Sequence, residues 1–159
     1  MSLVGTWKRV KVDNGMAFGK AIGATEAQLA SSANAVSTVT YTITGGNVKV
    51  ERCHKYDGKE LVSGLLTSKW PVLTHVTRHD PIWPEFQKTV NETAIGSEGE
   101  FDTMGYKIKA KLTGSADALE IACVSGWATA SAKVAGGQLV ETVTHNESGT
   151  TVTSYWDKC

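Results

Sequence analysis

The chain has 159 residues, a length typical of one domain with a sizeable core, and its 16 Lys and Arg residues balance its 16 Asp and Glu residues. No long run of one charge provides the basic surface that binds nucleic acid through phosphate contacts. No apolar stretch approaches the roughly 18 residues of a membrane-spanning helix, and the first residues lack a signal-peptide pattern. We therefore expect a single cytoplasmic domain, residues 1–159, with no nucleic-acid partner and no stable membrane insertion.

The three cysteines are Cys53, Cys123 and Cys159. An odd number without CxxC spacing argues against both a disulfide framework and a zinc knuckle. All three are predicted to be free thiols.

The first predicted element is a strand at about residues 4–12, and a helical region follows it. Asn14 is placed to cap a short helix in which Phe18 and Ile22 lie one turn apart, and Gly23 can end it. Residues 25–28, Thr-Glu-Ala-Gln, match a capping box that opens a second helix. The sequence thus predicts a strand and then a pair of short helices.

Alternation with a period of two residues dominates the rest of the chain. Between Tyr106 and Leu112, lysine fills every second position, as in a half-buried antiparallel strand. Similar runs, separated by Gly- and Asn-containing turns, lie at residues 37–44, 48–52, 119–124, 139–145 and 151–156. Many short strands joined by hairpins predict a sandwich or an up-and-down barrel, and closure of a barrel removes exposed edges.

Residues 61–91 interrupt this regularity. All the prolines of the chain, Pro71, Pro81 and Pro84, lie there together with Trp70 and Trp83. Loops longer than about 12 to 15 residues are uncommon in compact domains unless they are functional or disordered. The tryptophans and valines disfavour disorder, so we expect a functional inserted loop at about residues 61–91.

Several segments resemble the intracellular lipid-binding proteins, that is, the fatty-acid-binding and cellular retinoid-binding proteins. Residues 5–8, Gly-Thr-Trp-Lys, and residues 18–23 are similar to the family's opening GTWK strand and to its helix ending in KALG. Residues 98–102 resemble its EEF segment, and residues 137–145 resemble its GKLILTLTH strand. The resemblance implies an all-β, ten-stranded antiparallel up-and-down barrel with a helix-turn-helix lid between the first two strands. It also implies a carrier rather than an enzyme.

The resemblance implies a carboxylate anchor that this chain lacks. Family members that bind fatty acids or retinoic acid use an arginine in the eighth strand and an Arg-x-Tyr pair in the last strand. The first arginine falls on Ala132. The longer final hairpin allows two registers, so the pair becomes either Ser154 and Trp156 or Thr153 and Tyr155. None of these positions carries an arginine.

Burying a carboxylate without a cation costs several kcal/mol, so we expect an uncharged hydrophobic ligand. The first candidate is a retinoid-, carotenoid- or pigment-like polyene, and the second is a neutral lipid; no cofactor is required. The alternative is a fatty-acid-binding protein whose cationic anchor has moved, with Lys133, Arg52 and Arg78 as the candidates.

Alternation places Ala128, Ala130 and Val134 on the same wall as Ala132. Small side chains there either widen the cavity or pack against large residues opposite. In the family the inserted loop falls in the connection that forms part of the ligand portal. The loop would then act as a lid with contacts from its aromatic residues, or it would extend the barrel wall. The candidate ligand-binding residues are Phe18, Tyr41, Trp70, Trp83, Tyr106, Ile108, Ala130, Ala132, Ser154 and Trp156.

Metal and catalytic signals are weak. His75 and His79 have the spacing of one helical face, but there is no HExxH motif and the flanking prolines leave little room for a helix. Cys53 and His54 are neighbours on a predicted strand and would point to opposite faces. No metal ligand and no catalytic residue is predicted, and a haem- or chromophore-dependent enzyme on a similar barrel is the competing hypothesis.

Overall fold

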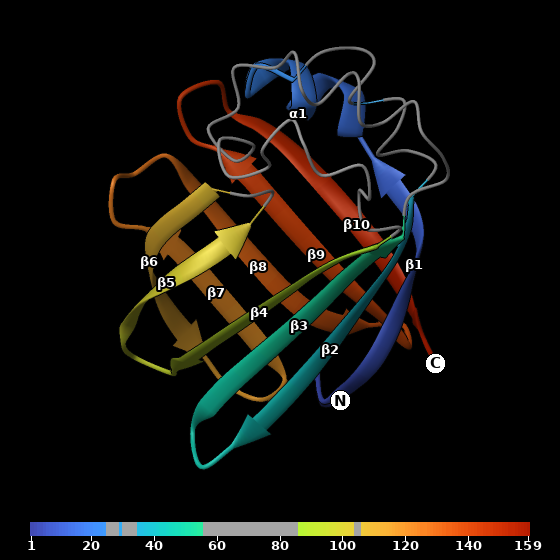
Figure 1. Ribbon diagram of the computed structural model, residues 1–159, viewed down its shortest axis with the longest axis vertical. Helices are drawn as coiled ribbons and strands as arrows, with labels where there is room; N and C mark the ends of the chain where they lie inside the picture. The colour runs from blue at the N-terminus through green and yellow to red at the C-terminus, as the bar shows by residue number, and fades with distance from the viewer. Residues whose placement is uncertain (25–28, 30–34, 56–85, 104–105) are drawn as a thin grey trace, which may run out of the picture.

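The computed structural model of the protein describes residues 1–24, 29, 35–55, 86–103 and 106–159. They form a ten-stranded antiparallel sheet that curls into a nearly closed barrel, with a short helix at one end (Figure 1). The elements in chain order are β1 (Gly5–Asp13), α1 (Gly15–Ala21), β2 (Val36–Thr44), β3 (Asn47–Lys55), β4 (Phe86–Ala94), β5 (Glu98–Thr103), β6 (Tyr106–Gly114), β7 (Ala118–Cys123), β8 (Ala128–Ala135), β9 (Gln138–His145) and β10 (Thr150–Lys158).

Neighbouring strands along the chain pair with each other, except β4 and β5, and β1 also pairs with β10. The order is β4-β3-β2-β1-β10-β9-β8-β7-β6-β5, so β4 and β5 are the two ends of the ladder. This up-and-down arrangement confirms the predicted all-β, ten-stranded barrel.

The helical region agrees with the prediction only in part. Helix α1 is present, and Gly23 follows it with a φ of 89°. Asn14 occupies the cap position, but it is left-handed and its side chain makes no cap hydrogen bond. The predicted capping contact is therefore wrong, because the Asn14 amide donates instead to the Thr151 carbonyl oxygen at 2.7 Å, tying α1 to β10. The second helix and the complete lid fall largely outside the described residues.

β4 begins before the predicted end of the inserted loop. Residues 86–91 belong to this strand, which pairs with β3 from Lys55 opposite Phe86 to Asn47 opposite Ala94. Residues 56–85, which hold the rest of the predicted loop, lie outside the described residues.

The core fills the end of the barrel away from α1. Trp7, Leu112, Leu139 and Trp156 are almost completely buried there, and the Trp7 indole donates to the Leu3 carbonyl oxygen at 2.9 Å. Toward α1, several inward-facing residues are only half-buried, among them Ile121, Ala130, Val143 and Val152, whereas Cys123, Ala128 and His145 at the strand ends are buried. The barrel is therefore packed at one end and less filled at the other.

No helix among the described residues is long and apolar enough to span a membrane.

Candidate ligand site inside the barrel

The pairing of β9 with β10 fixes the register that the sequence leaves open. Trp156 lies opposite Leu139, and Ser154 lies opposite Glu141. Because Trp156, Leu139 and Glu141 are all buried, this parity faces the interior. Ser154 and Trp156 are therefore the inward pair, and Thr153 lies on the other face.

A carboxylate lies where the resemblance implies cations. Glu141 on β9 is the cross-strand partner of both Ala132 on β8 and Ser154 on β10. The side chain of Glu141 is only 10% exposed. This part of the wall therefore carries a negative charge.

That charge is matched from the other side of the barrel. Arg52 on β3 binds Glu141 through two bonds, Nη1 to Oε2 at 2.9 Å and Nη2 to Oε1 at 2.8 Å. The Tyr41 hydroxyl on β2 donates to the same Oε1. We call Tyr41, Arg52 and Glu141 the internal polar cluster; it links three strands across the interior.

The ionisation states of the cluster follow from this geometry. Burial opposes a charge on Glu141, but the Arg52 guanidinium and the hydrogen bonds from Arg52 and Tyr41 outweigh it and lower the pKa of the carboxyl. Burial likewise opposes the charge on Arg52, and Glu141 outweighs it and raises the guanidinium pKa. Burial and the Glu141 charge raise the pKa of Tyr41 well above its usual value. The cluster is thus a neutral Tyr and an ion pair with no net charge.

A second polar contact lies beside the cluster. Ser37 on β2 and His54 on β3 are paired residues, and Ser37 Oγ is 2.7 Å from His54 Nδ1. Burial, together with the charges of Arg52 and Arg9, lowers the pKa of His54 from 6.5 to about 4. Near neutral pH this imidazole is uncharged.

The other predicted ligand-binding residues divide into two groups. Ile108, Ala130 and Ala132 share the inner wall with the cluster, and Phe18 is buried in α1. The small residues are expected either to widen the cavity or to pack against large residues opposite. Ala132 is buried in the core, as packing requires, whereas Ala130 is half-buried. Tyr106 begins β6, but its side chain is not described, and Trp70 and Trp83 lie outside the described residues.

The sequence interpretation missed Glu141 and assigned Arg52 only to the relocated-anchor alternative. A signal for both exists in the parity of their strands. Glu141 has the same parity as Leu139, and Arg52 has the same parity as Val48 and Val50. Their mutual pairing has no local signal, because the two residues are 89 positions apart.

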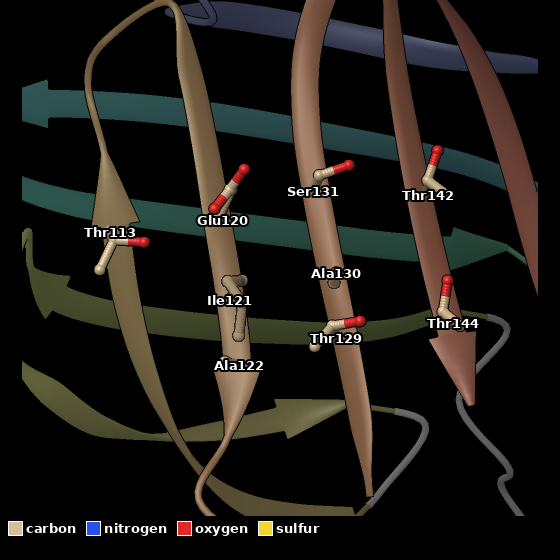
Figure 2. A pocket seen from close by; sticks show the side chains of 9 residues that line it. All are labelled: Thr113, Glu120, Ile121, Ala122, Thr129, Ala130, Ser131, Thr142 and Thr144. Carbon is tan, nitrogen blue, oxygen red and sulfur yellow. The ribbon is translucent and has the colours of Figure 1, made fainter. Parts of the chain in front are cut away.

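A shallow depression of about 320 Å³ lies along β6 to β9. Most of its lining residues have the parity opposite to the buried side chains, which places it on the outer face of the barrel. Figure 2 shows hydroxyl side chains along its neighbouring strands, among them Ser131, Thr142 and Thr144. Thr144 Oγ1 lies 2.8 Å from Thr151 Oγ1, so this hydroxyl already has a partner. The depression is open and its lining mixes hydroxyl groups with small apolar side chains, unlike an enclosed site for a hydrophobic molecule.

Within the described residues, no group of three or more His, Cys, Asp or Glu side chains is placed to hold a metal ion. His75 and His79 lie outside this part of the chain.

The chain is similar to known proteins in its three-dimensional structure. No protein-family model matches the sequence, and no curated protein matches it. A structure described as the REP1-NXSQ fatty acid transporter has a TM-score of 0.71 at 18% identity, covering 99% of this chain and 96% of the other. The zebrafish ileal bile acid-binding protein complexed with cholic acid has a TM-score of 0.68 at 18% identity and covers 100% of both chains.

The Schistosoma mansoni fatty acid binding protein in complex with arachidonic acid has a TM-score of 0.67 at 18% identity, covering 98% of this chain and 95% of the other. The chain therefore has the fold of the intracellular lipid-binding proteins over nearly its full length, in agreement with the resemblance in its sequence. At this identity the likeness establishes the fold.

Proposed function

We propose that the protein is a carrier or sequestering protein that holds an uncharged hydrophobic small molecule inside the barrel. A polyene of the retinoid, carotenoid or pigment type is the first candidate, and a neutral lipid is the second. The proposal is supported by the shared fold, since the similar structures are described as a transporter and as binding proteins. The observation that carries it is the pairing of Arg52 with Glu141 inside the barrel.

Arg52 has the inward position that a relocated carboxylate anchor requires, but Glu141 already occupies it. A fatty-acid carboxylate beside Arg52 would have to displace Glu141 or lie next to a second negative charge. Either arrangement leaves a buried carboxylate without its full set of partners, which is costly. The internal polar cluster therefore favours a ligand without a charge.

The remainder of the inner wall suits an apolar body. Ile108, Ala130, Val143 and Val152 face inward and are incompletely buried, so a bound molecule would remove their apolar surface from water. In this proposal the helix pair covers the mouth as a lid. Helix α1 supplies its first half, and Leu29 lies directly against Gly19 of that helix. The predicted cytoplasmic location suits such a carrier and remains an expectation.

Purification under native conditions tests the proposal. An absorption spectrum of the protein and mass spectrometry of its organic extract should reveal an uncharged hydrophobic compound in stoichiometric amount. An extract containing only ordinary fatty acids would contradict the uncharged ligand and favour the fatty-acid-binding alternative.

A further inference from the structure

Resting on the proposed function, we propose that the ligand carries an uncharged oxygen that accepts hydrogen bonds, such as the carbonyl oxygen of an ester, ketone or amide. Arg52 binds this oxygen with the N–H groups that Glu141 leaves unused. The inner wall therefore recognises one polar end of a molecule that is otherwise apolar.

The first step is the hydrogen-bond inventory of Arg52. A guanidinium carries five N–H donors in a fixed plane, and two of them point to the oxygens of Glu141. Tyr41 also interacts with the guanidinium, and within the described part of the chain the remaining N–H groups of Arg52 have no acceptor. Its side chain is 26% exposed, against 10% for Glu141. Because Arg52 has the inward parity of β3, its guanidinium lies inside the barrel.

The second step is the state of the acceptors. Glu141 Oε1 accepts hydrogen bonds from Tyr41 and Arg52, and Oε2 accepts one from Arg52. Most of the accepting capacity of this carboxylate is therefore used. Trp156, on the inner wall two residues from Ser154, is 2% exposed, and its indole N–H has no partner among the residues that the structure describes. A buried donor without a partner is unfavourable. The inner wall therefore holds a guanidinium and an indole whose donors are not all taken up by acceptors of the described residues.

Unused donors beside an ion pair without net charge should interact differently with three kinds of ligand end. A carbonyl oxygen accepts from Arg52 without disturbing Glu141. A carboxylate accepts as well, but it adds a second negative charge beside Glu141. A hydrocarbon end covers the donors and removes them from water without replacing the lost hydrogen bonds.

Three probes with the same polyene chain separate these cases: methyl retinoate, retinoate and the hydrocarbon axerophthene. Their dissociation constants for the wild-type chain can be measured from the quenching of tryptophan fluorescence. Methyl retinoate should bind about tenfold tighter than axerophthene and tighter than retinoate, as expected for a hydrogen bond to a charged donor. Equal binding of the ester and the hydrocarbon would overturn the inference and leave the proposed function intact. Failure of all three to bind would contradict the polyene ligand of the proposed function and overturn the inference with it.

The variant Arg52→Met/Glu141→Leu removes the ion pair as a unit, so no buried charge is left alone. In this variant the ester should bind no more than about twofold tighter than the hydrocarbon. The matched control is Lys109→Met/Glu98→Leu, which removes an exposed ion pair of 3.4 Å between β6 and β5 and should keep the ester preference. An ester preference that persists in the first variant would overturn the role of Arg52. The comparison of probes on the wild-type chain stands even if a variant does not fold.

Discussion

The carboxylate of Glu141 neutralises the Arg52 charge inside the barrel. It accepts hydrogen bonds from Tyr41 and Arg52, which reach it from two other strands. Replacing one member of such a cluster leaves the other charge buried without compensation. The effect of a substitution should therefore depend on which partner is left behind.

We expect Glu141→Gln to lower the free energy of unfolding by about 2 to 4 kcal/mol, because Arg52 loses its counter-charge. The same change should raise the affinity for oleate, since Arg52 then becomes a cationic anchor. Urea unfolding and calorimetric titration with oleate measure the two effects. Glu98→Gln, which alters an exposed ion pair on the outer face, serves as the control and should change neither. If Glu141→Gln behaved like this control, the internal polar cluster would not determine the ligand's charge.

His54 should make the stability depend on pH. Its pKa is about 4 in the folded chain because of burial and the charges of Arg52 and Arg9, and 6.5 is its ordinary value. Between these values the unfolded chain binds the proton and the folded chain does not, so stability is lost as the pH falls from about 6.5 toward 4. At pH 5 the loss relative to pH 7 should be about 2 kcal/mol, and it should be absent in His54→Gln. Urea unfolding of both proteins at the two pH values tests this, and equal losses in both would show that His54 is not the group responsible.

Among the elements, β4 and β5 meet at a close contact near their shared turn. A Cβ atom on Gly99 would lie 2.3 Å from Thr93 Oγ1 and 3.0 Å from Thr93 Cγ2. Gly99 therefore allows these two strands, which end the ladder, to approach where the barrel nearly closes.

We expect Gly99→Ala to lower the free energy of unfolding by about 1 to 3 kcal/mol through overpacking. Gly99→Ala/Thr93→Ala removes both obstructing atoms and should recover most of that loss. Gly114→Ala is a useful contrast, because its Cβ would meet the backbone oxygen of Ala118 at 2.2 Å and no side-chain change can relieve it. Thermal unfolding of the wild-type chain, Gly99→Ala, Thr93→Ala and the double variant measures the coupling, and additive losses at Gly99 and Thr93 would contradict the proposed contact.

Most of the strands could be predicted because one face of each is apolar. In β2, Val39 and Tyr41 are buried and alternate with polar residues, so the period of two is visible. Strand β4 is hidden for the opposite reason, since its buried residues include Asn91 and Thr93, which carry no hydrophobic signal. The cap at Asn14 failed because a distant carbonyl, that of Thr151, binds the side chain in place of the helix.

The internal polar cluster shows what the sequence alone leaves out. Glu141 and Tyr41 are 100 positions apart, and only closure of the barrel brings them together. The position of the missing arginines could be predicted from the resemblance, but not the ion pair that takes their place. Charge within a barrel depends on which strands lie opposite each other.

At the scale of the whole molecule, the barrel wall is continuous from β3 to β4 without residues 56–85. Lys55 and Phe86 are direct partners at the end of this hairpin. A two-residue Asn-Gly turn has the geometry to join such a pair.

We expect a chain with Asn-Gly in place of residues 56–85 to fold, because the nine-residue strands β3 and β4 keep their full register. Far-ultraviolet circular dichroism should retain the strand signal, and thermal unfolding should stay cooperative. The fluorescence of the remaining tryptophans should still report a buried environment for Trp7 and Trp156. Loss of cooperative unfolding would mean that the replaced residues are needed for the core.

The pairing of β1 with β10 also has a consequence for synthesis. Trp7 lies opposite Lys158, and the Cys159 amide donates to the Thr6 carbonyl oxygen at 2.9 Å, so the first and last strands adjoin, as do the chain ends in Figure 1. During translation, β1 leaves the ribosome before the other nine strands, and its partner β10 leaves after all of them. One edge of the growing sheet therefore stays unpaired until β10 has been made, and for that interval it is open to pairing with another chain.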